Sequence, residues 1–159
     1  MDADGQHPPQ ELVRLLARVR AGACDVAVGS RFVSGDGYEP YRYRPSAARR
    51  FGTGLLRRSV GVVLRRPFND ATSGLYAVNA KAMPLLAEPY TSGAPEVEAL
   101  IRVVEAGLRL EEVPVNMAAR AGGESKLRGS KAVKLVLTVA ATIVVALLER
   151  KRRSRRRHR

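Results

Sequence analysis

The chain of 159 residues has no tryptophan, a single cysteine and only 5% aromatic residues. A lone cysteine excludes an intrachain disulfide framework. Cys24 also has no Cys or His neighbour at metal-ligand spacing, so we expect a reducing compartment. The shortage of aromatic residues predicts a mainly aliphatic core. A hydrophobic content of 45% is enough for one such core in a domain of this length.

The sequence also lacks an apolar run long enough to cross a bilayer without help. The stretch "LVLTVAATIVVALL", residues 135–148, is apolar or Thr throughout. As a helix it would be about 21 Å long, against the roughly 30 Å of a bilayer core. It therefore predicts a helix lying partly in the membrane interface, where Lys131 and Lys134 could extend to the surface. A buried C-terminal helix is the alternative.

Basic charge is concentrated at one end of the chain. The net charge is +13, and eight of the 28 Lys and Arg residues lie in "RKRRSRRRHR", residues 150–159. Such a run stays solvated and usually contacts phosphates of lipid or nucleic acid. Because it follows an apolar segment, it suits an anionic membrane surface on the cytoplasmic side. No aromatic platform or nucleic-acid motif accompanies the charge, so specific nucleic-acid binding is disfavoured.

Helical and strand patterns alternate along the chain, which predicts an α/β fold with a sheet flanked by helices. An irregular loop rich in Gly, Pro and Tyr is expected at 33–45, and glycines weaken the pattern of the second helix. The helix patterns begin at Pro8–Pro9 and stop at Gly22, run from about Ser46 to Leu64, begin near Asn79, and run from Pro95 to Gly107; the strand patterns cover Val26–Gly29, Leu75–Val78 and about 110–117.

Two carboxylates stand at the start of the sequence. In an extended segment Asp2 and Asp4 project from the same face, so they could together hold Mg²⁺ or Mn²⁺ through oxygen ligands. Such a metal would offset the charge of a leaving diphosphate. A solvated pair of surface carboxylates is the alternative that the spacing alone leaves open.

The order of motifs is more specific than any single motif. The segments are "DADGQHPPQEL", "DVAVGSRF", "DATSGLYAVNAKA", "PEVEALI" and "EVPVNMAARAGGESK", in this order. Their succession closely resembles the catalytic half of the family 2 glycosyltransferases, which include dolichyl- and polyprenyl-phosphate sugar transferases. The resemblance covers about residues 1–128 and implies a partial GT-A-like, Rossmann-like nucleotide-sugar transferase sheet.

The resemblance also implies roles for individual residues. Asp2 and Asp4, with Gln6 nearby, would hold the metal and the diphosphate of the nucleotide sugar, and Asp4 would be catalytic. The phosphates of donor or acceptor would be bound by Arg31 and by a mobile loop over the lipid phosphate that carries Arg120, Ser125 and Lys126. An Arg forks onto a phosphate, whereas a Lys acts as a point charge. Without the motif order, these basic residues would read as solvated.

Two further acidic residues are candidates for the catalytic site. Asp70 lies in "NDATSG" with Thr72 and Ser73, a segment interpreted first as a structured turn that shapes the acceptor site. The family often has an aromatic residue followed by Arg or Gln where this chain has Leu75 and Tyr76, so the sugar preference is open. Glu96, like Glu98, could be a general base, or could stabilise the first turn of its helix.

The family normally carries about a hundred residues of nucleotide-binding half before the Asp-x-Asp segment. We therefore expect an N-terminally truncated chain that binds nucleotide sugar poorly and aggregates, because a sheet without its first strands exposes an edge. The expected organisation is a catalytic half at 1–128, an apolar helix at 129–149 that could associate with the membrane, and a disordered basic tail at 150–159. The expected function is sugar transfer from a nucleoside diphosphate sugar to a polyprenyl phosphate, peripheral to the membrane or in the cytoplasm. A catalytically inactive, membrane-associated interaction protein is the alternative, and the oligomeric state is open.

Overall fold

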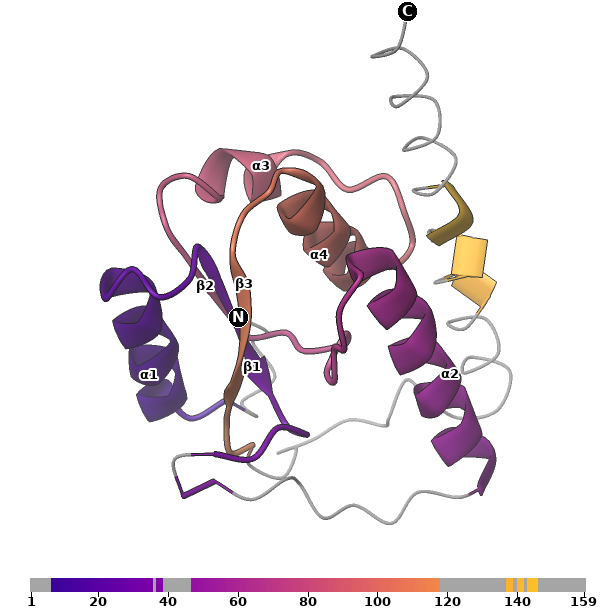
Figure 1. Cartoon of the computed structure of the whole chain (residues 1–159), viewed down its shortest axis with the longest axis horizontal. Coiled ribbons are helices and arrows are strands. Elements are labelled where there is room, and N and C mark those ends of the chain that lie inside the picture. Colours follow the sequence, from indigo (N-terminus) through magenta and orange to yellow (C-terminus); the bar gives the residue numbers. More distant parts are fainter. Residues whose placement is uncertain are drawn as a thin grey trace, which may run out of the picture.

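A computed structural model describes most of the first three quarters of the chain. It covers residues 7–35, 37–38 and 47–117, together with 137–138, 140–141 and 143–145. Four helices and three strands lie in the two long segments, 7–35 and 47–117 (Figure 1). They are α1 (Pro9–Arg20), β1 (Val26–Ser30), α2 (Ala47–Leu64), β2 (Tyr76–Val78), α3 (Met83–Ala87), α4 (Pro95–Glu105) and β3 (Leu110–Pro114).

The three strands form one mixed sheet in the order β2-β1-β3. Strand β1 pairs antiparallel with β2, with Val26 opposite Val78, and parallel with β3, with Val26 opposite Leu110. All five residues of β1 are buried because β1 is the central strand. Helices and strands combine in one α/β unit, as the alternating pattern predicted. The finer GT-A-like assignment stays a prediction.

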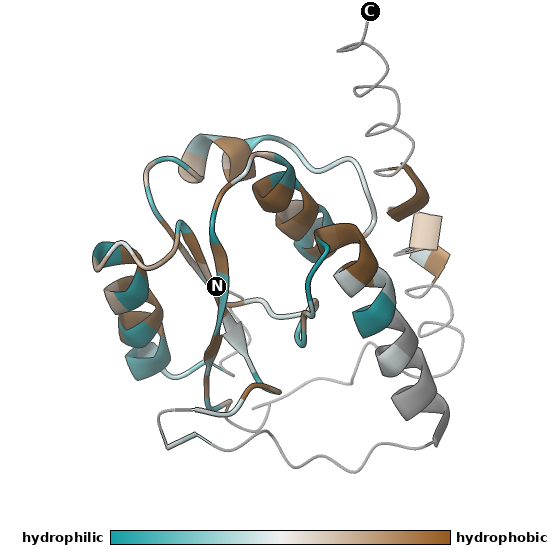
Figure 2. Cartoon of the chain, in the orientation of Figure 1, coloured by the Kyte–Doolittle hydropathy of each residue, from teal (hydrophilic) through white to brown (hydrophobic). Residues whose placement is uncertain are grey.

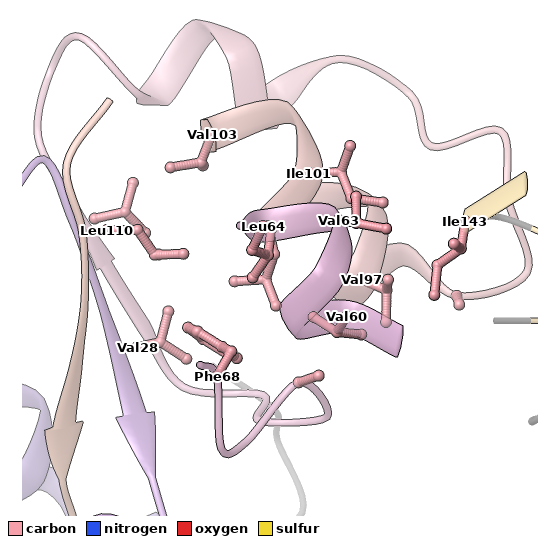
Figure 3. Packing of buried hydrophobic residues seen from close by; sticks show 14 of the residues in the cluster. Val28, Val60, Val63, Leu64, Phe68, Val97, Ile101, Val103, Leu110 and Ile143 are labelled. Atoms are coloured by element: carbon pink, nitrogen blue, oxygen red, sulfur yellow. The ribbon is translucent and has the colours of Figure 1, made fainter. Parts of the chain in front are cut away.

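Helices cover both faces of the sheet (Figure 1). Side chains alternate along a strand, so Val26 and Val28 face α2 and α4, whereas Ala27 faces α1. The layer beneath α2 and α4 is the larger one, and α4 is more hydrophobic than α1 (Figure 2). Figure 3 labels residues of this larger layer: Val28, Val60, Val63, Leu64, Phe68, Val97, Ile101, Val103, Leu110 and Ile143.

Proline and glycine set the helix boundaries as the sequence predicted. Pro9 and Pro95 occupy the first turns of α1 and α4, where a missing N–H costs nothing. Gly22 and Gly107 follow these helices with φ of 70° and 71°, a left-handed conformation that glycine adopts without a Cβ clash. The second helix is also confirmed, as one continuous helix, α2, despite its glycines.

Two local predictions were wrong. The apolar spacing of the sequence predicts that Val13 shares one face of α1 with Leu12, Leu15, Leu16 and Val19, yet Val13 is 65% exposed, and Leu15 is the fully buried residue of that helix. The helix expected near Asn79 begins only at Met83. The reason is the Asn79 side chain, whose Oδ1 accepts hydrogen bonds from the backbone N–H groups of Lys81 and Ala82 and so closes a turn first.

Strand β3 lies at the edge of the described sheet and ends at Pro114. A proline in this strand pattern predicts either an edge strand or a bulge, and the structure shows the edge strand: the missing N–H of Pro114 falls at the last paired position, opposite Ser30. The ladder continues one bond further, because the Val115 N–H donates to the Ser30 carbonyl at 3.1 Å. This pairing carries the chain past the end of β1, where the candidate site lies.

The predicted apolar helix at 135–148 falls largely outside the described residues, as does the basic tail. Of the residues described there, Ile143 is buried in the larger core layer, whereas Leu137 and Val144 are more than half exposed. In the parts of the chain that the structure describes, no helix combines the length and apolarity needed to cross a membrane. Membrane contact by this segment stays a prediction.

Candidate functional site at the end of strand β1

Three of the predicted site residues lie in the described part of the chain: Arg31, Asp70 and Glu96. The structure brings two of them together, because Arg31 directly follows β1 and Asp70 lies in the connection between α2 and β2. The other predicted site residues lie outside the described residues, and their roles stay predictions. They are Asp2, Asp4 and Gln6 of the metal set and Arg120, Ser125 and Lys126 of the phosphate loop.

Arg31 and Asp70 form a two-pronged ion pair. The Arg31 Nε and Nη2 atoms donate to the two carboxylate oxygens of Asp70 at 2.7 and 2.5 Å, and the Arg31 backbone N–H donates to Oδ2 at 3.0 Å. The Asp70 side chain is fully buried, whereas 26% of the Arg31 side chain is exposed. A planar guanidinium held at two points has one orientation. Arg31 is therefore a fixed cation at the surface end of β1.

The Thr72–Ser73 segment is docked onto the same strand end. Thr72 Oγ1 accepts a hydrogen bond from Arg31 Nη2 at 2.9 Å. The Ser73 hydroxyl donates to the Gly29 carbonyl at 2.5 Å and accepts from the Leu75 N–H at 3.3 Å. The backbone closes a turn, because the Ser73 N–H donates to the Asp70 carbonyl at 3.2 Å. The interpretation of this segment as a structured turn is confirmed, while its part in an acceptor site stays a prediction.

Glycine at position 29 is required by packing. A Cβ built there would lie 3.0 Å from Leu75 Cδ2 and 3.2 Å from both methyl groups of Val115. Such distances are tighter than ordinary contacts between methyl groups. The glycine of the Gly29-Ser30-Arg31 motif thus allows the connection before β2 and the segment after β3 to close over the end of β1.

Sequence reasoning missed four residues of this site: Phe32, Arg57, Asn69 and Glu112. The Glu112 carboxylate accepts hydrogen bonds from the backbone N–H groups of Asn69 and Asp70 and from Asn69 Nδ2, at 2.9 to 3.0 Å. The Asn69 Oδ1 atom in turn accepts a short hydrogen bond from Arg57 Nη2. Glu112 could have been found from its strand pattern, since it is a charged residue at a position that faces the core. The other three carry no comparable signal in the sequence.

Two cations lie near the ring of Phe32. The guanidinium carbons of Arg31 and Arg57 lie 5.3 and 6.0 Å from the centre of its ring, within the range of cation–π attraction. Phe32 is 37% exposed. A partly exposed aromatic side chain beside a fixed arginine and a second arginine gives this end of the sheet a surface suited to a ligand with both apolar and anionic parts.

The glutamates at the start of α4 are not joined to this cluster. No hydrogen bond or ion pair among the described residues links Glu96 to Arg31 or Asp70. Glu98 accepts hydrogen bonds from the backbone N–H groups of Thr91 and Ser92 and from Arg102 Nη2. Burial alone would raise the pKa of Glu98, but the hydrogen bonds from Ser92, Arg102 and Thr91 outweigh it and lower the pKa to about 2. Glu98 is therefore a poor general base at neutral pH, and it anchors the preceding loop.

Comparison with known proteins gives the chain named relatives. It is 32% identical over 96% of its length to the polyprenol monophosphomannose synthase of Mycolicibacterium smegmatis, and 32% identical over 87% to the undecaprenyl-phosphate mannosyltransferase of Micrococcus luteus. It is 31% identical over 81% of its length to the dolichol-phosphate mannosyltransferase of Pyrococcus furiosus. No family model matches the chain.

The chain spans only part of these relatives. It covers 57% of the Mycolicibacterium protein, 56% of the Micrococcus protein and 35% of the Pyrococcus protein. The matched part nevertheless includes nearly the whole chain, and with it the Arg31, Asp70 and Glu112 cluster. The chain is thus a homologue of glycosyltransferases, the class of enzyme that the order of its motifs predicted.

Proposed function

We propose that the chain carries the acceptor-side and metal-binding part of a mannosyltransferase, which moves mannose from a nucleoside diphosphate mannose to a polyprenyl phosphate. The observation that carries this proposal is the similarity of 96% of the chain to a protein named as a polyprenol monophosphomannose synthase. The fixed cation at the end of β1 supports it, because ligands of open α/β sheets bind beyond the carboxyl ends of the strands.

The reaction is a direct displacement. An anionic oxygen of the polyprenyl phosphate forms a bond to C1 of mannose as the bond from C1 to the diphosphate oxygen breaks, and the nucleoside diphosphate leaves. The attacking phosphate is already anionic, so no general base is required. Glu96 then serves the first turn of α4, where the helix dipole favours a carboxylate.

The acceptor phosphate would be bound by Arg31 together with Arg120, Ser125 and Lys126. Asp70 would hold Arg31 in place, since its buried carboxylate bonds two guanidinium nitrogens. A cation that is already oriented does not have to be immobilised when the phosphate arrives, which favours binding. Thr72 and Phe32 border the same position.

The donor diphosphate would be held through Asp2, Asp4 and Gln6. Two carboxylates and an amide oxygen are the hard oxygen ligands that Mg²⁺ and Mn²⁺ prefer, so this set of donors fits the ion. When bound, the ion would offset the negative charge of the leaving diphosphate. Asp4 would be the acidic residue nearest to this step.

The acceptor is a membrane lipid, so the protein would work at the membrane surface. Residues 129–149 and the basic residues 150–159 would hold it at the anionic cytoplasmic face, where each Lys or Arg contributes about 1 kcal/mol. Vesicle flotation with and without residues 150–159 tests this part. Loss of binding to anionic vesicles on deletion is expected, and unchanged flotation would contradict it.

The enzymatic proposal is tested with a chimera, because the chain spans little more than half of its first relatives. The chain replaces the matching segment of the Mycolicibacterium smegmatis synthase, and transfer of radiolabelled mannose from GDP-mannose to polyprenyl phosphate is measured with Mn²⁺. Transfer is expected, with loss in EDTA and in Asp4→Ala. The matched control is Glu88→Ala, an exposed carboxylate outside the cluster. A folded chimera without transfer, beside an active parent synthase, would contradict the proposal.

A further inference from the structure

Glu112 occupies a position that its strand pattern reserves for the core. Along β3, Leu110 belongs to the layer beneath α2 and α4, whereas Val113 belongs to the layer beneath α1. Alternation therefore directs Glu112 to the α2 and α4 side and Glu111 to the α1 side. Glu111 agrees, because it pairs with Arg18 of α1 at 2.7 Å. A carboxylate facing the larger apolar layer needs a specific reason to be there.

The contacts of Glu112 supply that reason. Its carboxylate accepts from three N–H donors, two of which are the consecutive backbone amides of Asn69 and Asp70, both at about 2.9 Å. No ion pair to Glu112 occurs among the described residues. The carboxylate thus works as a template for the backbone at 69–70, and among the described residues its charge is stabilised by two peptide N–H groups and the side-chain amide of Asn69.

The segment that Glu112 holds is the one that presents Asp70 to Arg31. The Asp70 N–H bonds Glu112 at 2.9 Å, while the Asp70 carboxylate bonds Arg31 at 2.5 and 2.7 Å. On this geometry we propose that Glu112 is a positioning residue, which acts through the backbone of Asp70 to fix the direction of the Arg31 guanidinium. The catalytic consequence of this inference, its effect on sugar transfer, rests on the proposed function. Its structural step, the orientation of Arg31 by Glu112, does not.

Replacing Glu112 by Gln changes the hydrogen bonding of this side chain while keeping its size. The amide has nearly the same shape, but its NH₂ group would face N–H donors of Asn69 that now bond a carboxylate oxygen. The 69–70 backbone should shift, and Asp70 with it. A misplacement of this kind costs about 10- to 100-fold in rate when the displaced group orients a substrate. Glu111→Gln, one residue away on the opposite face, is the matched control.

The structural step is tested on the chain itself by NMR. The Arg31 Nε–H, assigned by its absence in Arg31→Lys, is expected to exchange slowly with water in the parent, because it bonds a buried carboxylate. Glu112→Gln should speed this exchange, and Glu111→Gln should leave it unchanged. An unchanged Arg31 signal in Glu112→Gln would overturn the proposal whatever the enzyme assay shows.

The catalytic consequence is tested in the chimera. Glu112→Gln should raise KM for polyprenyl phosphate about tenfold or more and leave KM for the sugar donor unchanged, which a general loss of folded protein would not do. Equal effects of Glu112→Gln and Glu111→Gln, or a change in both KM values, would count against a positioning role. If the chimera has no activity at all, the proposed function fails, while the NMR result still decides the structural step.

A second variant covers failure to fold. If Glu112→Gln lacks the circular dichroism of the parent, Glu112→Asp is measured instead, since it keeps both acceptor oxygens on a shorter side chain. Its Arg31 exchange should lie between that of the folded parent and that of the parent unfolded in urea, which serves as the fast reference. Exchange equal to the parent's would overturn the proposal here as well.

Discussion

The two ends of strand β1 each carry a carboxylate paired with an arginine, but the pairs are built differently. At the first end, the Asp25 carboxylate accepts hydrogen bonds from the Arg109 backbone N–H and from Asn79 Nδ2, both at 2.8 Å. The Arg109 guanidinium adds only one bond, at 3.3 Å, and its side chain is 59% exposed. Asp25 therefore links neighbouring loops. It would keep most of its hydrogen-bond partners if the Arg109 guanidinium were removed.

At the second end, the guanidinium is the main partner. The fully buried Asp70 carboxylate depends on Arg31 for three of its hydrogen bonds, two of them from the guanidinium. A buried carboxylate that accepts hydrogen bonds from the backbone thus stabilises the fold. A buried carboxylate that accepts most of its hydrogen bonds from one side chain orients that side chain. Only the second arrangement leaves a directed cation at the carboxyl end of a strand, where α/β proteins bind ligands.

The largest expected effect is a difference in stability between removing the Arg31 guanidinium and removing the Arg109 guanidinium. Arg31→Met leaves a buried, uncompensated carboxylate and should lower the free energy of unfolding by about 3–5 kcal/mol. Arg109→Met should change it little, because Asp25 keeps its backbone and Asn79 partners. Urea unfolding followed by circular dichroism measures both.

Arg31→Lys provides the control for charge. It keeps a cation but loses the planar fork, so its loss of stability should lie between those of the parent and Arg31→Met. Equal losses in Arg31→Met and Arg109→Met would show that the two ends do not differ.

The next effect concerns the glycine that lets the second end close. Gly29→Ala should cost about 1–3 kcal/mol, because the new Cβ would press on Leu75 and Val115. Gly54→Ala in α2 is the matched change: apart from its chain neighbours and the backbone of its own helix, no atom of the described residues would lie within 4 Å of the new Cβ, so it should stabilise the helix by up to about 1 kcal/mol. Unfolding midpoints that move in the same direction for both variants would refute the packing argument.

Much of the fold could be predicted from the sequence because its signals are local. Proline at a helix start, glycine after its end and short apolar runs identify α1, α4 and β1 within a few residues. The signal fails where a side chain competes with the backbone, as at Asn79, and where an apolar residue such as Val13 lies beside the buried face. Which helix covers which face of the sheet depends on long-range packing, which no local pattern specifies.

The candidate site, too, could be predicted from the sequence only in part. The motif order singled out Arg31 and Asp70, but their pairing joins residues 39 apart and could not be derived from either motif. Glu112 is separated from Asp70 by 42 positions, and only its place in the strand alternation marks it. The role of Asp2, Asp4, Gln6, Arg120, Ser125 and Lys126 stays a prediction, because these residues lie outside the described part of the chain.

Acid should weaken the hydrogen bonds that the carboxylates of Asp25 and Glu98 accept. Hydrogen bonds from the Arg109 backbone and side chain lower the pKa of Asp25 from 3.8 to about 2, and the pKa of Glu98 falls from 4.5 to about 2. Because the folded-state values are the lower ones, their stabilisation is complete above about pH 4.5 and is lost as the pH falls toward 2.

Urea midpoints measured between pH 6 and pH 2 should therefore decline in the parent and decline less steeply in Asp25→Asn and in Glu98→Gln. Glu88→Gln, an exposed carboxylate, serves as the control and should follow the parent. A parent curve that stays flat to pH 2 would contradict the assigned pKa shifts.

The smallest effect is one of reactivity, and it compares the two ends through a thiol that lies at the first end. Cys24, next to Asp25, is 1% exposed, and burial together with the Glu111 carboxylate raises the pKa of its thiol to about 11. A thiol reagent at pH 8 should thus react only when the chain unfolds. In that regime the rate follows the population of unfolded chain, so Arg31→Met should speed the reaction strongly and Arg109→Met only slightly. A faster reaction in Arg109→Met than in Arg31→Met would mean that the first end opens locally, and that Asp25 holds its loops through the guanidinium after all.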